Sequence, residues 1–160
     1  MKFICSLIVV ENIEKSRYLY EHILKQSVTT DFGENIAFAG GFALHKKDHF
    51  QKLIGNHTIK NKSNNFELYF EDDDLEKIEN QIKDENLDFI HTIMEQPWKQ
   101  KVIRFYDYDG NIIEIGERME HVAYRLFKEN KTIEEIVRIT YLSREKIEEA
   151  ITEYTNDNTI

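Results

Sequence analysis

Two neighbouring stretches late in the chain alternate between apolar and polar positions with a period of two residues. The first covers 102–107 and the second covers 111–116, and such alternation is typical of β-strands. Asp109-Gly110 lies between them and is a strong signal for a tight turn. The pattern predicts a β-hairpin in which Glu114 points away from the face formed by its isoleucine neighbours.

The same order of elements is predicted twice along the chain. The first set is a strand over 3–10, a helix from Ile13 to about Lys25 and extended segments over 35–39 and 42–46. The second set is a strand over 66–71, a helix that begins near Leu75 and extended segments over 88–95, 101–107 and 111–117. Residues 48–64 between the sets look polar and irregular. This order predicts a tandem repeat of βαβββ modules.

After residue 117 the alternation stops and a helical period returns. Thr132 and Glu135 have the spacing of a capping box, and Ser143 is expected to cap a last helix. We therefore predict an α+β fold of paired βαβββ modules with a mixed β-sheet and a C-terminal helical appendage. The expected domains are a two-module domain over 1–118, with modules of about 3–54 and 65–118, and a helical extension over 119–160.

Composition and charge narrow the functions to be considered. The 160 residues are 41% hydrophobic, with 30 Asp and Glu against 21 Lys and Arg and a formal charge of −9. An acidic chain repels phosphate backbones, so we expect no nucleic-acid partner. The lone Cys5 excludes an internal disulfide, and neither a secretory signal nor an apolar run of about twenty residues is present. We expect a cytoplasmic protein with no membrane association.

Three motifs resemble the glyoxalase/bleomycin-resistance/dioxygenase superfamily, also called vicinal oxygen chelate proteins. They are the opening Val-x-x-Ile-Glu-Lys-Ser at 10–16, the run Tyr69-Phe70-Glu71 followed by acids, and the closing hairpin with its apolar-apolar-Glu-apolar-Gly strand. The resemblance covers 3–118. It implies two sheets that curl into a cup for small organic molecules, with a glutamate equivalent to Glu114 at the end of a metal or substrate site.

In metal-dependent members, the resemblance implies one ligand from the first and one from the last strand of each module. The corresponding residues here are Glu67 and Glu114 in the second module, with Cys5 and Ala43 or Leu44 in the first. Two carboxylates and a thiol without histidine are a poor set for zinc or nickel. Two glutamates and water can hold magnesium or manganese weakly, so a divalent metal ion is a possible cofactor and none is certain.

Further candidates surround the hairpin. His91 is either an acid or base of the cup face or a hydrogen-bonded structural histidine. Arg104 is expected either to clamp an anionic ligand or to pair with a neighbour such as Glu114. Trp98 is expected to be a mobile lid or a plug at the end of the cup, and Tyr69 is a further substrate-binding candidate. By contrast, we expect His45, His49 and His57 to be solvated.

Two functions of different classes follow. The first is conversion of a small oxygenated or electrophilic molecule, as in lactoylglutathione lyase-like enzymes, with Glu114, Glu67 and His91 as catalytic candidates. The alternative is a metal-free protein of bleomycin-resistance type that sequesters a small molecule. A ligand-dependent transcription regulator is disfavoured, because 119–160 hold nine acidic against six basic residues. The amphipathic tail suggests a homodimer.

Overall fold

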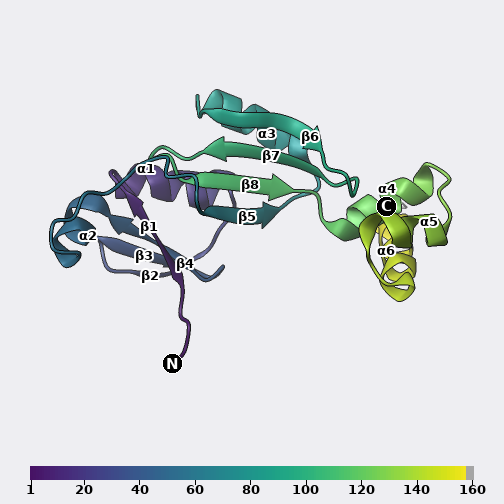
Figure 1. Cartoon of the computed structure of the whole chain (residues 1–160), viewed down its shortest axis with the longest axis horizontal. Helices are drawn as coiled ribbons and strands as arrows, with labels where there is room; N and C mark the ends of the chain where they lie inside the picture. Colours follow the sequence, from purple (N-terminus) through teal and green to yellow (C-terminus); the bar gives the residue numbers. More distant parts are fainter. Residues whose placement is uncertain (158–160) are drawn as a thin grey trace. The chain divides into compact units, whose positions relative to one another are not determined.

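The computed structural model describes residues 1–157 (Figure 1). Residues 158–160, the end of the expected C-terminal extension, lie outside the described residues. The chain divides into two compact units. Unit 1 holds residues 1–68, 80–90 and 105–113, and unit 2 holds 69–79, 91–104 and the chain from Glu114 onward. The boundary crosses several strands, so the predicted domain limits stay a prediction.

The first module is confirmed as βαβββ, with one change of detail in its helix. Its strands are β1 (Ser6–Val10), β2 (Val28–Asp31), β3 (Asn35–Phe38) and β4 (Phe42–Lys46). They form a four-stranded sheet in the order β1-β4-β3-β2, in which β1 and β4 are parallel and the other pairs antiparallel. The expected helix begins as α1 (Ile13–Tyr18), and Asn12 caps it by accepting from the Lys15 N–H. It continues as a π-helical turn, η1 (Leu19–Ile23).

The second module repeats this topology, as the sequence predicts. It consists of β5 (Glu67–Glu71), α3 (Leu75–Asp84), β6 (Phe89–Glu95), β7 (Lys101–Tyr106) and β8 (Ile112–Gly116). The strand order β5-β8-β7-β6 reproduces that of the first sheet. Gly110 in the predicted turn between β7 and β8 has φ +82°, a conformation that glycine adopts without steric cost.

The segment between the modules contains a helix that the sequence analysis missed. Residues 48–64 were expected to be irregular, but α2 (Lys47–Leu53) occupies the first part. The expectation was wrong because α2 has no buried residue and hence no apolar stripe to reveal it.

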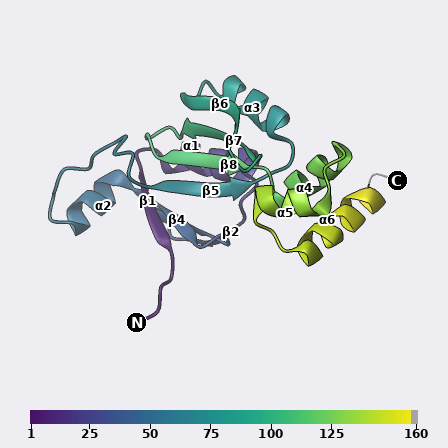
Figure 2. The ribbon, with the colours of Figure 1, turned by 45° about the vertical axis from the view of Figure 1, so that its right-hand side comes forward.

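Three helices form the C-terminal extension: α4 (Met119–Lys128), α5 (Ile133–Thr140) and α6 (Arg144–Asp157). The capping box between Thr132 and Glu135 is confirmed. Figure 2 shows the three helices lying side by side. Their apolar faces meet in one core, whose fully buried members are Val122, Ala123, Leu126, Ile136 and Ile147.

This packing changes one inference about the extension. The amphipathic tail was expected to contribute to a homodimer, but the apolar stripe that contains Ile147 packs within the three helices. The amphipathic pattern is therefore accounted for inside one chain, and it no longer argues for a homodimer. Among the described helices, none combines the length and apolar character needed to cross a bilayer.

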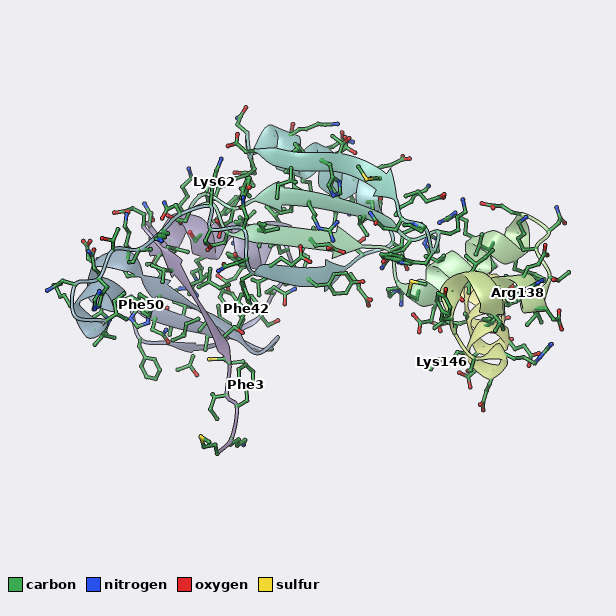
Figure 3. The ribbon with its side chains drawn as sticks, viewed as in Figure 1. Phe3, Phe42, Phe50, Lys62, Arg138 and Lys146 are labelled. Carbon is green, nitrogen blue, oxygen red and sulfur yellow. The ribbon has the colours of Figure 1, made fainter. Side chains whose placement is uncertain are left out.

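We predict that Ile147→Ala destabilises the extension by about 2–5 kcal/mol, because it removes a fully buried side chain and leaves a cavity. Urea unfolding followed by circular dichroism measures this loss. Lys146→Ala is the matched control, since Lys146 is exposed on the preceding position of α6 (Figure 3). Equal stability of the two variants would contradict the described core.

Candidate functional site

The polar face of the second sheet centres on an ion pair between β7 and β8. The Arg104 guanidinium donates to the Glu114 carboxylate. Glu114 is only 7% exposed, whereas 28% of the Arg104 side chain is exposed. A buried carboxylate needs a partner that offsets its lost hydration. Of the two roles left open for Arg104, the structure therefore contains the pairing with Glu114.

His91 on β6 joins this pair from the other side of Arg104. Its Nε2 lies 3.3 Å from Arg104 Nη1, and its Nδ1 lies 2.8 Å from the Thr92 carbonyl oxygen. Because a carbonyl only accepts, Nδ1 carries the proton and Nε2 accepts from the guanidinium. Both ring nitrogens are thus engaged, an arrangement that favours a structural histidine over a catalytic base.

A second polar group is organised by Gln100, which sequence analysis did not single out. Gln100 is 5% exposed. Its Oε1 accepts from Trp98 Nε1 at 2.9 Å, and its Nε2 donates to the Tyr69 hydroxyl at 2.9 Å and to the Glu117 carbonyl at 2.8 Å. The Trp98 donor and the two acceptors fix the orientation of the amide. Gln100 therefore connects two of the predicted substrate-binding residues, Trp98 and Tyr69.

Tyr69 on β5 is a hydrogen-bond donor at neutral pH. Its hydroxyl donates to Glu71 Oε1 at 2.9 Å. Burial and this bond to Glu71 raise the pKa of the Tyr69 phenol to about 12, although the bond from Gln100 acts in the opposite direction. The phenol therefore stays protonated over the physiological range.

Gly116 makes room for this group on the face that also carries Glu114, two residues earlier on β8. A Cβ at Gly116 would lie 2.8 Å from Gln100 Nε2 and 3.1 Å from the Tyr69 hydroxyl. Any larger residue would push these side chains aside. The glycine in the predicted apolar-apolar-Glu-apolar-Gly strand thus lets Gln100 and Tyr69 meet.

Glu67, the other glutamate of the predicted metal pair, belongs to unit 1, whereas Glu114 belongs to unit 2. Its side chain is exposed on β5 and lines a hollow of about 410 Å³ together with Asn64, Asn65, Phe66 and Ile112. The described residues of unit 2 bring together His91, Arg104 and Glu114, and separately Tyr69 and Trp98.

The residues present fit a divalent metal poorly. Within residues 1–157, no group of three or more His, Cys, Asp and Glu side chains is arranged to hold a metal ion. The Glu114 carboxylate is in addition neutralised by Arg104, which places a positive charge where a cation would have to lie.

One expectation about histidines was wrong. His45 was expected to be solvated, but it is 7% exposed because it lies in β4, whose residues are almost all buried. Its Nε2 lies 2.9 Å from His49 Nδ1. Burial and the nearby His49 lower the pKa of His45, while Glu34 opposes this shift. His45 is a structural histidine of the first module.

Comparison with known proteins identifies the family. The sequence profile of the glyoxalase-like domain family matches residues 3–120, most of the chain. The chain belongs to this family. The match confirms the resemblance to the vicinal oxygen chelate superfamily that the sequence motifs indicate, and it ends within α4.

Solved structures share the fold of this glyoxalase-like protein. A protein of unknown function from Agrobacterium tumefaciens str. C58 is 32% identical, with a TM-score of 0.65 over 74% of this chain and 94% of that one. A lactoylglutathione lyase from Agrobacterium tumefaciens is 13% identical, with a TM-score of 0.55 and coverage of 72% and 92%. The fosfomycin resistance protein FosX from Mesorhizobium loti is 16% identical, with a TM-score of 0.53 and coverage of 71% and 89%. No curated protein sequence matches.

We predict that Arg104 and Glu114 of this glyoxalase-like protein are energetically coupled. Arg104→Gln leaves a buried carboxylate unpaired and should cost about 1–3 kcal/mol or more, since charged groups lie at the upper end. Glu114→Gln should cost less, because Arg104 is partly exposed and water can reach it. The double variant should lose less than the sum, with a coupling of about 0.5–3 kcal/mol measured by urea unfolding.

The exposed pair Arg144–Glu134 is the matched control. The same cycle with Arg144→Gln and Glu134→Gln should give a coupling of about 0.2–1 kcal/mol, because water screens the pair. Additive losses at Arg104 and Glu114 would contradict the described ion pair.

Proposed function

We propose that this glyoxalase-like protein is a metal-free binding protein for small molecules that carry an anionic or oxygen-rich group. The binding surface is the polar face of the second sheet. Arg104 supplies the polar anchor on β7, and Tyr69 and Trp98 supply aromatic surface from the same unit. This corresponds to the sequestration alternative of the sequence analysis.

The observation that carries the proposal is the arginine at Glu114. Metal-dependent members of the superfamily are expected to use the equivalent glutamate as a ligand, and here its charge is already balanced by Arg104. The same pairing leaves over a quarter of the Arg104 side chain exposed. A planar guanidinium with several N–H donors suits carboxylate, phosphonate and similar oxygens better than a lysine does.

The aromatic neighbours support binding of an organic molecule. Trp98 is 40% exposed and Tyr69 is 48% exposed, although both are fixed by hydrogen bonds through Gln100. Such side chains offer apolar area at a low entropic cost, because their conformation is already restricted. Small-molecule sites commonly combine aromatic surface with a few positioned polar groups.

The candidate catalytic groups favour binding over conversion. His91 uses both ring nitrogens in contacts with Arg104 and Thr92, and the Glu114 carboxylate is already paired with Arg104. A general base must be able to take up a proton near neutral pH. The solved neighbours named lactoylglutathione lyase and fosfomycin resistance protein share the fold alone at their low identity. They make small oxygenated compounds a rational choice of probes.

The test is a thermal-shift and calorimetric screen of small carboxylates, phosphonates and neutral oxygenated molecules, with fosfomycin and lactoylglutathione included. A binder at 100 times its Kd should stabilise the fold by about 2.7 kcal/mol. Addition of EDTA should leave its affinity unchanged. Arg104→Gln should weaken binding by about 10- to 100-fold, the value of a charge-assisted hydrogen bond.

Arg138→Gln serves as the control for this screen, since Arg138 is exposed on α5 and donates to the Glu134 carbonyl of its own helix. Its affinity for the binder should equal that of the parent protein. Binding or turnover that requires a divalent metal and disappears with EDTA would reject the proposal in favour of a metal-dependent enzyme.

A further inference from the structure

We propose that the C-terminal helix α4 positions the Trp98 loop through Arg125, and thereby couples the helical extension to the polar face of the second sheet. The Trp98 loop is defined as residues 96–100, which connect β6 to β7. The consequence for ligand affinity rests on the proposed function, whereas the positioning itself does not. All residues involved belong to unit 2.

The loop is a tight turn, and the Lys99 carbonyl near its end accepts a hydrogen bond from α4. The Gln96 N–H donates to the Gln100 carbonyl at 2.8 Å, and the Lys99 N–H donates to the Gln96 carbonyl at 2.8 Å. Lys99 has φ +71°, a left-handed conformation that is unfavourable for lysine. Such a conformation persists when the surroundings fix it. The contact that fixes the Lys99 carbonyl comes from Arg125 Nη2, at 2.6 Å.

Arg125 also binds the buried carboxylate of Glu117, directly after β8. Its Nη2 donates to Glu117 Oε2 at 2.9 Å and its Nε donates to Oε1 at 3.3 Å. Glu117 is 3% exposed, and its Oε2 accepts from the Lys101 N–H at 2.8 Å. Lys101 begins β7, so the carboxylate holds one end of the loop while Arg125 holds the carbonyl of Lys99.

Charge around Glu117 keeps this group ionised. Burial alone would raise its pKa, but contacts from His121, Arg125 and the Lys101 N–H outweigh burial and lower the pKa to about 2. The His121 Nδ1 is buried without a hydrogen-bond partner and lies 3.5 Å from Glu117 Oε1 and 3.6 Å from Asp73 Oδ1.

The contacts continue from Glu117 to the ligand face. The Glu117 carbonyl accepts from Gln100 Nε2, and the same amide group bonds Trp98 and Tyr69. Arg125 is therefore connected to both aromatic residues by two routes of hydrogen bonds, one through the Lys99 carbonyl and one through Glu117. The match to the glyoxalase-like family ends at residue 120, so this arginine comes from the part of the chain outside the family domain.

The test uses Trp98, the single tryptophan of the chain, as a local reporter. In the ligand-free protein, Arg125→Gln should shift the emission to longer wavelength and increase quenching by acrylamide, because the loop loses its anchor. Arg125→Lys keeps the charge but lacks the planar fork, so it should give an intermediate change. The far-UV circular dichroism of Arg125→Lys should equal that of the parent protein. Such a result shows that its emission change comes from a displaced loop and not from unfolding.

Acid titration adds a second measurement on the parent protein. Glu117 has a lowered pKa in the folded state. The stabilisation that its ionised carboxylate gives to the fold is therefore complete above the ordinary pKa of 4.5 and is lost as the pH falls toward about 2. The Trp98 emission should change over that interval, and Glu117→Gln should abolish this part of the titration. An emission that is flat from pH 4.5 to 2 in the parent protein would overturn the proposal.

Arg138→Gln on α5 is the matched arginine control and should leave Trp98 emission unchanged. For a binder found in the screen above, Arg125→Gln should weaken affinity by about two- to tenfold, the value of one ordinary hydrogen bond. Unchanged emission and quenching in both Arg125 variants, or an equal change in Arg138→Gln, would overturn the coupling. A Trp98 response without any binder in the screen would support the coupling and reject the proposed function.

Discussion

Two buried carboxylates, Glu114 and Glu117, impose the main constraint on the second module. They lie three residues apart, Glu114 within β8 and Glu117 directly after its last residue. Each is almost completely withdrawn from water, and each is paired with an arginine, Arg104 or Arg125. Removing an ion from water costs several kcal/mol unless charge and hydrogen bonds compensate for it. The positions of both arginines follow from this requirement.

The two pairs have different consequences because their arginines come from different elements. Arg104 lies on the neighbouring strand β7, so its pair is set by the sheet itself and remains on the polar face. Arg125 lies on α4, so its pair joins the extension to the end of β8 and to the loop before β7. An arginine as counter-charge also provides N–H donors in a fixed plane, whereas a metal ion would require additional ligands.

Much of the fold was predictable because it depends on local patterns. The alternation of residues 102–116 and the Asp109-Gly110 turn predict the hairpin, and the repeated order of elements predicts the two modules. The capping box at Thr132 predicts the start of α5. The helix α2 was missed because it buries no side chain, and the burial of His45 was missed because it depends on how β4 lies within its sheet.

The candidate site was predictable only in part, for a physical reason. Glu114, Arg104 and His91 were recognised because a polar residue in an apolar strand stands out locally. Their mutual pairing depends on strand register, which the sequence left open. Gln100 and Glu117 were missed because each lies directly beside the end of a strand, where polar residues are common. The Gly116 that faces Gln100 is the one sequence signal for this contact, since a glycine inside a strand often marks close approach of another group.

The repeat has conserved the scaffold of this protein but not its chemistry. The last strands of the two modules have equal length, and their third residues are Leu44 in β4 and Glu114 in β8. In the first sheet Leu44 pairs with Ile8, and both side chains are buried. The first module thus fills the core-facing side of this strand with apolar residues, and the neighbouring Ala43, the other candidate position, is also buried and apolar. A symmetric metal site would need comparable ligands from both modules, and neither Leu44 nor Ala43 supplies one. The second module instead pairs Glu114 with Arg104, so the two last strands differ in a way that supports the arginine-based binding face proposed above.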